Sequence, residues 1–368
     1  MPTSITRTGG VAVLAAALAL GAAACGGDDG GRGGGSGDAK GAKIALLLPE
    51  SKTTRYEQQD RPNFERRVKE LCAGCEVIYA NAEQDPAKQQ QQAEQAITNG
   101  AKAIVISAVD VKSAASIVTR AKQSKIPVIS YGRLVSDADL DYYVSIDPFK
   151  VGEQQGKALL DALKGAGKAS PSVAMIHGSS TDSNAAPYRK GAHSVLDSAG
   201  VKIVKEFDTP DWSPDKAQRE MEQTITSAGK DGFDGVYVAN DGMAGGVIAA
   251  LKGAGIDPAS RFVTGQDAEV AGVQRILTGE QLMTVYQPIT KIAETSAELA
   301  VPLAQGKKAP AIAKERVNNG MKDVPSVLLP TIAITKDNID VLIKDGFLKP
   351  DQICTSKYAK ACAKAGIQ

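Results

Sequence analysis

The chain has 368 residues, in which 43 Lys and Arg residues nearly balance 42 Asp and Glu residues. This balance gives no electrostatic reason to expect nucleic acid or an anionic membrane surface as a partner. The length exceeds what one hydrophobic core usually holds, so we expect two lobes.

The N-terminus has the pattern of an export signal followed by a tether. Arg7 precedes an apolar stretch from Val11 to Ala24, which is shorter than the roughly 20 residues that cross a bilayer as a helix. Small residues before Cys25 provide a cleavage site, so residues 1–24 are predicted to be a secretory signal peptide. The Gly-rich residues 25–42 have little to bury and are predicted to form a flexible tether.

The segment that ends in Cys25 resembles a bacterial lipobox, in which this cysteine is acylated and becomes the mature N-terminus. Ala22 stands where the lipobox usually has Leu, so a plain signal peptide with an incidental cysteine is the alternative. The tether favours the lipid anchor, because a slack segment holds a domain near a membrane. The prediction is a protein anchored to the outer face of the bacterial cell membrane.

After the tether, short β-branched runs alternate with amphipathic or Ala-rich segments. The runs predict strands at residues 43–49, 76–81, 103–108, 127–132, 142–146, 172–178, 201–207, 235–240, 261–267 and 282–287. Helices are predicted between most of them, at 85–99, 112–124, 150–164, 184–199, 214–228, 242–254 and 288–305. This alternation predicts an α/β fold with parallel sheets covered on both faces. Periodicity alone leaves one large sheet, a barrel and two doubly wound lobes open.

In each of these architectures a ligand binds at the carboxyl ends of the strands. The side chains that follow the predicted strands are carboxylates, amides, guanidinium groups and aromatic rings: Glu50, Arg55, Tyr56, Arg133, Asp182, Asn184, Arg189, Trp212, Asn240, Asp241, Gln266, Asp267 and Gln287. Such groups suit a neutral polyhydroxylated ligand, because carboxylates and amides bind hydroxyl groups and Arg donates in a fixed plane. Taken singly, Asp182, Asn240 and Asp267 fit helix N-caps equally well. The prediction rests on their joint position.

Catalytic motifs are absent from the sequence, which has no G-x-S-x-G elbow, no H-E-x-x-H, no Walker A loop and no G-x-G-x-x-G after a strand. His177 and Ser179 lie too close along one strand end to act as a base and a nucleophile. The sequence therefore predicts a binding protein that is not an enzyme, with no cofactor and no metal.

Four cysteines follow the tether as two close pairs, Cys72 with Cys75 and Cys354 with Cys362. Export to an oxidising compartment predicts two local disulfides. A Cys-x-x-Cys pair can also be a redox centre or half of a zinc site, but the only two histidines, His177 and His193, are far from both pairs in the sequence. We therefore predict structural disulfides.

Seven stretches resemble, in chain order, the D-xylose-binding proteins among the type I periplasmic sugar-binding proteins. They are residues 55–65, 136–147, 181–191, 240–251, 264–289, 318–329 and 343–354. The resemblance implies two doubly wound parallel-sheet lobes joined by three chain crossings, near residues 147, 286–288 and 323–325. The N-lobe would be 43–147 plus 288–324, and the C-lobe 148–287 plus 325–368.

The resemblance also implies sugar contacts at Arg55, Tyr56, Arg133, Asp182, Asn184, Arg189, Trp212, Asn240 and Asp267. Three positions depart from the xylose-binding pattern: Gly132 replaces an Asp, Gln287 replaces a Lys and Tyr56 replaces a Trp. Gln287 remains a predicted contact. Because one acid and one base are lost together, the predicted ligand is xylose or a related monosaccharide.

As partners, the resemblance implies an ABC permease with its ATPase, to which a monomeric receptor delivers the sugar. The alternative is a sensor that presents a sugar or a signalling molecule to a membrane receptor kinase. A DNA-binding repressor with the same lobes is disfavoured, because the signal and tether occupy the place of a helix-turn-helix.

Overall fold

The computed structural model describes residues 41–367. The predicted signal peptide, Cys25 and nearly all of the tether lie outside this range. Within it, none of the helices combines the length and the apolar character needed to cross a membrane.

The first sheet has seven strands in the order β10-β11-β5-β4-β3-β1-β2. Their bounds are β1 Lys43–Leu48, β2 Glu76–Asn81, β3 Ala101–Ile106, β4 Val128–Tyr131, β5 Tyr142–Ile146, β10 Glu315–Asn318 and β11 Asp323–Leu329. All neighbouring pairs are parallel except β10 with β11, which form an antiparallel edge. The predicted parallel sheet therefore gains one antiparallel strand.

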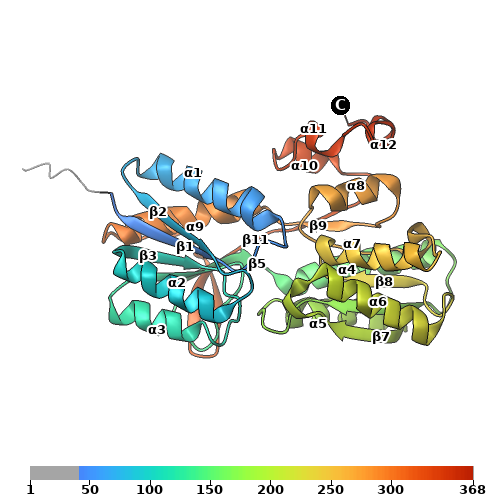
Figure 1. The fold of residues 1–368 in the computed structure, drawn as a ribbon, viewed down its shortest axis with the longest axis horizontal. Helices are drawn as coiled ribbons and strands as arrows, with labels where there is room; N and C mark the ends of the chain where they lie inside the picture. Colours follow the sequence, from blue (N-terminus) through green and yellow to red (C-terminus); the bar gives the residue numbers. More distant parts are fainter. Residues whose placement is uncertain (1–40, 368) are drawn as a thin grey trace, which may run out of the picture. The chain divides into compact units, whose positions relative to one another are not determined.

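Helices cover both faces of this sheet (Figure 1). Ile44, Leu46 and Leu48 of β1 pack in one core cluster with residues of α1 (Arg61–Leu71) and α9 (Ile289–Ala304). The alternate residues Ala45 and Leu47 pack in another with α2 (Pro86–Thr98) and α3 (Ala115–Gln123). Successive side chains of a strand point to opposite faces, so a strand buried on both faces must be apolar throughout.

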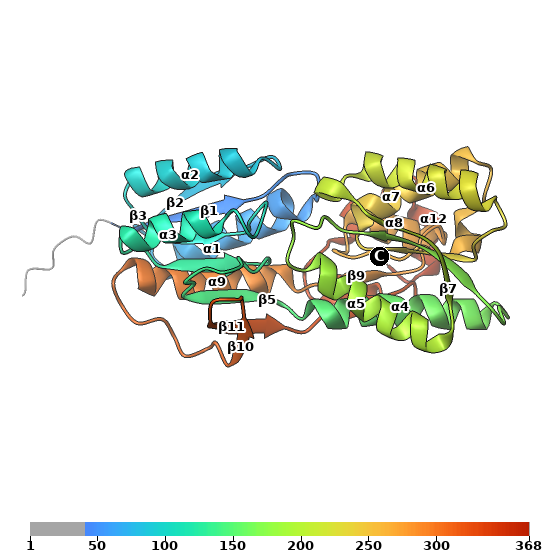
Figure 2. The same ribbon diagram turned by 90° about the horizontal axis from the view of Figure 1, so that it is seen from below.

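The second sheet is built around three parallel strands in the order β7-β6-β8. They are β6 Ser172–His177, β7 Lys202–Asp208 and β8 Gly235–Val238. Figure 2 shows α4 (Pro148–Gly165) and α5 (Ala185–Leu196) on one side of this sheet, and α6 (Pro214–Ala228) and α7 (Asp241–Gly253) on the other. Short 3₁₀ turns lie at Asp197–Ala199, Pro210–Trp212 and Pro258–Arg261.

Two further strands, β9 (Thr284–Tyr286) and β12 (Ile332–Ile334), form an antiparallel pair. The strand predicted at 261–267 is reduced to a bridge between Gln266 and Val285. Its ends leave extended geometry, because Phe262 and Asp267 have φ angles of 47° and 92°. Residues 263–266 still join β8 to β9, since the amide of Thr264 donates to Val236 and that of Val285 to Gly265.

The C-terminal segment packs on α8 (Val270–Thr278) as three short helices, α10 (Asp340–Lys344), α11 (Pro350–Ile353) and α12 (Ala359–Lys364). A disulfide joins Cys354 to Cys362, with sulfur atoms 2.11 Å apart. The second disulfide joins Cys72 to Cys75 at 2.07 Å, directly after α1.

The chain crosses between the two sheets three times. The first crossing follows β5 at Asp147, whose side chain caps α4 by accepting from the amides of Phe149 and Lys150. The second lies between β9 and α9. The third was expected near 323–325, but β11 stays in the first sheet until Leu329, which pairs with Ile146. Residues 325–329 thus belong to the first sheet, where the neighbouring Val324 is fully buried.

Candidate functional site

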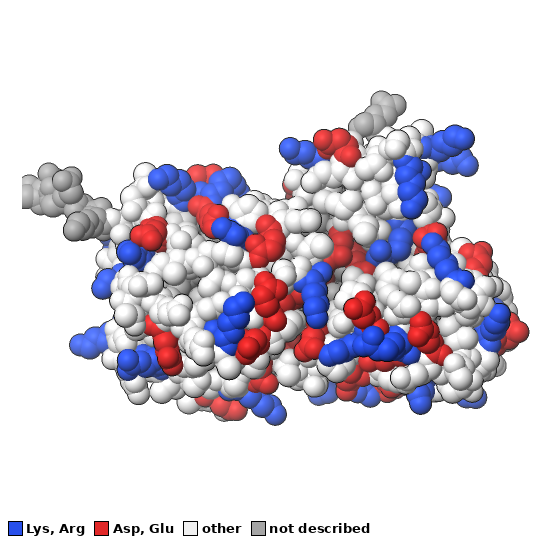
Figure 3. Space-filling view, in the orientation of Figure 1, with Lys and Arg blue, Asp and Glu red and all other residues white. Residues whose placement is uncertain are grey.

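A small cavity, partly open to solvent, lies at the carboxyl ends of strands from both sheets. It is lined by Thr53, Arg55, Tyr56, Gly132, Arg133, Asp182, Asn184, Tyr188, Trp212, Asn240, Gln266, Asp267 and Gln287. On the face of the molecule drawn in Figure 3, Lys and Arg are interspersed with Asp and Glu, and no extended patch carries one sign of charge.

Nine of the ten predicted ligand contacts line this cavity, and Arg189 does not. The Nη2 atom of Arg189 lies 2.7 Å from Oε2 of Glu206, and its side chain is 40% exposed. Consecutive residues of an α-helix point about 100° apart, so Tyr188 turns toward the cavity and Arg189 turns away. Tyr188 follows Asn184 by four residues, which places both on one helix face. That spacing is the signal by which Tyr188 could have been found.

Arg55 is held rigidly on the side of the first sheet. It lies just before a single π-helical turn at Tyr56–Asp60. Its Nε and Nη2 atoms donate to the two carboxylate oxygens of Asp60 at 2.9 and 2.8 Å, and the Tyr131 hydroxyl donates to the same carboxylate. Burial alone would lower the pKa of Arg55, but Asp60 and Asp267 outweigh it and raise the pKa well above the usual value. The guanidinium is therefore charged.

Arg55 also reaches residues from the second sheet. Its Nη1 atom donates to Oε1 of Gln287 at 3.1 Å and lies 3.6 Å from Oδ1 of Asp267. Gln287 in turn donates to Asp267 at 3.0 Å. The amide at Gln287, where the xylose-binding pattern has Lys, thus bridges a charged pair without adding charge of its own.

Arg133 makes the second charged contact across the cavity. Its Nη1 atom donates to the carbonyl of Ala108 at 2.9 Å, and its Nε atom lies 2.8 Å from Oδ2 of Asp182, an ion pair without the angle of a hydrogen bond. Nearby, the side-chain amide of Asn184 donates to the carbonyl of Gly132 at 2.9 Å. Gly132 has φ 69°, a left-handed conformation that favours glycine.

Trp212 forms an aromatic wall with Tyr188. Their rings meet edge to face with centroids 6.4 Å apart, and the indole packs on Gly178, where an added Cβ would lie 2.1 Å from Cη2 of Trp212. Within residues 41–367, neither Nε1 of Trp212 nor Oε1 of Gln266 has a hydrogen-bond partner. Buried polar atoms without partners are costly, so these two atoms are suited to a polar ligand.

Asn240 and Asp241 both stabilise the fold through their side chains, but only Asn240 also lines the cavity. Asn240 lines the cavity and also caps α7, because its Oδ1 accepts from the amide of Met243 at 3.0 Å. Asp241 does not line the cavity. Its carboxylate accepts from Gln281 at 2.6 Å and from Thr284 and the amide of Glu269 at 2.9 Å. Asp241 therefore holds the segment that carries Asp267 and Gln287.

The chemistry of the cavity is that of recognition. Two guanidinium groups, Arg55 and Arg133, face two carboxylates, Asp182 and Asp267, so the lining is close to neutral. Burial raises the pKa of Asp267, while Arg55 opposes that shift. Amides and aromatic rings fill the remaining wall. This combination suits a neutral molecule with many hydroxyl groups.

Two doubly wound lobes with a polar cavity at their facing strand ends define the type I periplasmic binding protein fold. Residues 44–308 match the model of the periplasmic binding protein domain. The chain therefore belongs to this family, within its type I sugar-binding proteins. Membership confirms the predicted fold class and the prediction that the chain is not an enzyme.

Among its relatives are D-xylose-binding periplasmic proteins. The chain is 38% identical to that of Escherichia coli over 320 residues, which are 86% of this chain and 93% of the relative. Identity to the Haemophilus influenzae protein is also 38%, over 86% of this chain and 94% of the relative. A solved ABC transporter solute-binding protein from Clostridium phytofermentans, with bound β-D-glucose, is 30% identical with a TM-score of 0.76, covering 84% of this chain and 99% of that one.

Proposed function

We propose that this protein captures a monosaccharide, xylose or a related sugar, in the cavity and delivers it to an ABC importer. The observation that carries the proposal is the near-neutral cavity, in which Arg, Asp, amide and aromatic side chains converge from both sheets. The xylose named for two relatives and the glucose bound to a third are the sugars to consider first. The changes at Gly132 and Gln287 favour a relative of xylose over xylose itself.

In this proposal each group has a role set by its chemistry. Asp182, Asn240 and Asp267 accept hydrogen bonds from sugar hydroxyl groups, and Arg55 and Arg133 donate to sugar oxygens. Tyr56 and Trp212 cover the C–H faces of the ring. Thr53, Tyr188 and Gln266 join them as further contacts, because they line the same cavity.

Sugar binding is coupled to closure of the two lobes. Hydrogen bonds also join the two lobes directly: the Thr54 amide donates to Glu269 at 3.0 Å, and the Leu134 amide donates to the Ser183 hydroxyl at 2.8 Å. A ligand shifts such an equilibrium only through higher affinity for the closed state. The closed form is the one that a permease would recognise.

The first test is a thermal-shift panel of pentoses, hexoses and small disaccharides, measured in EDTA. A sugar at 100 times its dissociation constant stabilises the folded state by roughly 2.7 kcal/mol. We expect a pentose or a closely related hexose to give the largest shift. If none of these sugars raises the unfolding temperature, the proposal of a sugar receptor fails.

The lipid anchor is part of the proposal and rests on the sequence around Cys25. Replacing Cys25 with Ser should release the protein from the membrane fraction of the producing cells into the soluble extracytoplasmic fraction. Retention of the variant in the membrane fraction would contradict the anchor.

Delivery to a permease and presentation to a receptor kinase differ in their effect on sugar uptake. If the protein serves an importer, deleting its gene should abolish high-affinity uptake of the radiolabelled sugar. In this proposal the protein acts as a monomer. Unchanged uptake together with a lost transcriptional response to the sugar would favour the sensor.

A further inference from the structure

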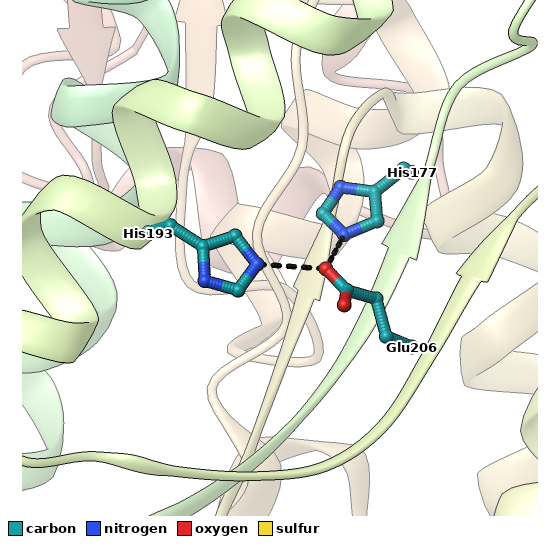
Figure 4. Close-up of side chains that lie close together, drawn as sticks. All are labelled: His177, His193 and Glu206. Atoms are coloured by element: carbon teal, nitrogen blue, oxygen red, sulfur yellow. Dashed lines mark hydrogen bonds and ion pairs between the residues drawn. The ribbon is translucent and has the colours of Figure 1, made fainter.

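The side chains of two histidines and a glutamate meet in the second lobe (Figure 4), and none of the three lines the cavity. His177 ends β6, His193 lies on α5, and Glu206 lies on β7. The Nε2 atoms of His177 and His193 each lie 2.7 Å from Oε1 of Glu206. The ligand-type atoms of the three residues all lie within 4.8 Å of one another.

From this geometry we propose that His177, His193 and Glu206 bind a divalent transition-metal ion, with zinc as the best match. Two imidazole nitrogens and one carboxylate oxygen form a ligand set that proteins use for zinc. In a tetrahedral site with ligands at about 2.1 Å from the metal, ligand atoms are about 3.4 Å apart. Both Nε2–Oε1 separations, at 2.7 Å, are shorter than that value, so the side chains would move apart by about 0.7 Å to admit the ion.

The outer contact of His193 supports this assignment. Its Nδ1 atom lies 3.1 Å from both carboxylate oxygens of Asp197. A proton on Nδ1, donated to Asp197, leaves the lone pair of Nε2 free for a metal. Metal-binding histidines commonly donate their second nitrogen to a carboxylate in this way.

The local charges suit a divalent cation. Glu206, Asp197 and Asp208 bring three negative charges, and Arg189 brings one positive charge through contacts to Glu206 at 2.7 Å and Asp208 at 3.4 Å. Arg189 contacts Oε2 of Glu206, whereas both histidines contact Oε1. The oxygen that faces the histidines is therefore the one left for the metal.

The site is accessible on one side and fixed on the other. His177 is 1% exposed, whereas His193 and Glu206 are 25% and 23% exposed. The ion would enter from the side of His193 and keep a solvent-facing position for a water ligand. Since the three residues come from β6, α5 and β7, the bound ion would tie these elements together.

The test uses the purified chain without a histidine tag, because His177 and His193 are then its only histidines. Zinc is titrated against a chromophoric chelator, and ring ¹⁵N signals are recorded on histidine-labelled protein. We expect one zinc per chain with micromolar or tighter affinity, and metal-induced shifts of the Nε2 signals of both histidines. Absence of saturable binding, or a shift of only one ring, would overturn the site.

Variants separate this site from other zinc binding. His193→Gln and Glu206→Gln should each weaken zinc binding at least tenfold. The matched control is Glu220→Gln, which removes another half-buried carboxylate of the same lobe, one that accepts from Thr209 at 2.6 Å; its zinc affinity should equal that of the wild type. If all three variants bound zinc with the affinity of the wild type, the assignment would be contradicted. Unfolding curves in EDTA show whether each variant is folded. The zinc result does not affect the thermal-shift panel of sugars, so the zinc site and the sugar site are tested separately.

Discussion

Trp212 owes its position to the absence of a side chain at Gly178. An alanine Cβ at Gly178 would lie 2.1 Å from Cη2 of the indole, which is too close for two non-bonded carbon atoms, so the ring must move. Gly178→Ala should therefore weaken sugar binding by at least tenfold and leave the fold intact. Titration calorimetry with the best sugar of the panel measures the loss.

Gly165→Ala is the matched control for that variant, because nothing lies within 4 Å of a Cβ added there. Gly165 ends α4, where Ala is a better helix former than Gly. Its sugar affinity should equal that of the wild type. If Gly178→Ala also bound normally, Trp212 would have no part in the site.

Variants of Asp267 and Arg189 test whether the cavity binds the sugar, because Asp267 lines the cavity and Arg189 does not. Asp267→Asn should cost about 2 kcal/mol of binding, roughly 30-fold in Kd, because Arg55 and the sugar hydroxyl groups lose a charged acceptor. The φ of 92° at this residue is positive, and Asn, like Asp, is one of the few non-glycine residues enriched at positive φ. Arg189→Gln, outside the cavity, should change Kd less than twofold in EDTA. The reverse order of the two effects would refute the cavity as the binding site.

At the residue level, the rule that ligands bind at strand ends found most of the cavity but missed Thr53 and Tyr188. Arg55 and Trp212 lie in the segments that follow β1 and β7, and Asp267 follows the bridged residue Gln266, so their position in the sequence was sufficient. Choosing between Tyr188 and Arg189 requires the rotation of α5 about its axis. That rotation is set by packing against α4, which the sequence does not reveal.

At the level of elements, strands with long apolar runs were predictable and short edge strands were not. β1 and β6 are buried along most of their length, and their sequences show it. The edge strand β10 has the exposed sequence ERVN, which carries no strand pattern. The continuation of β11 to Leu329 depends on pairing with β5, a long-range contact that periodicity does not encode.

The C-terminal disulfide holds two helices that are too short to be stable alone. α11 and α12 have 4 and 6 residues, well below the roughly 12–15 needed for an isolated helix. Closing the short loop from Cys354 to Cys362 is worth about 2.5 kcal/mol in the chain-entropy model. Replacing both cysteines with Ser should speed amide hydrogen exchange in residues 350–367, measured by mass spectrometry.

The pair Cys72 and Cys75 supplies the control for the tail. Its replacement by Ser should leave exchange in residues 350–367 unchanged, because this disulfide follows α1 in the first lobe. The tail also buries Ile353 and Ile367 against α8. If exchange there stayed slow without the Cys354–Cys362 bond, this apolar packing alone would hold the tail.

For the whole molecule, the alternation of strands and helices fixed the α/β class but not the division into two lobes. One sheet, a barrel and two lobes share that pattern, and the family resemblance decided among them.

Three acidic groups of the second lobe are buried or partly buried close to one another. Asp241, Asp267 and Glu269 lie close together where the second lobe faces the cavity, and burial raises the pKa of Asp241 to about 7 and of Glu269 to about 8.

These raised pKa values make stability depend on pH with a definite sign. In the unfolded chain Asp and Glu lose their protons near pH 4, whereas folded Glu269 keeps its proton until about pH 8. Between these values the folded state binds more protons than the unfolded state, so raising the pH lowers the free energy of unfolding. The decrease in the free energy of unfolding that Glu269 causes is complete above pH 8, and there is no decrease below pH 4.

The unfolding temperature of the sugar-free protein should therefore fall as pH rises from 6.5 to 9. Glu269→Gln, which resembles the protonated acid, should flatten this fall and be more stable than the wild type at pH 9, because its side chain cannot ionise. The Thr54 amide, which donates to Oε1 of Glu269 at 3.0 Å, can still donate to the Gln carbonyl. Glu94→Gln, at an exposed site on α2, should keep the wild-type slope. Equal slopes for wild type and Glu269→Gln would mean that Glu269 is ionised in the folded protein throughout this range.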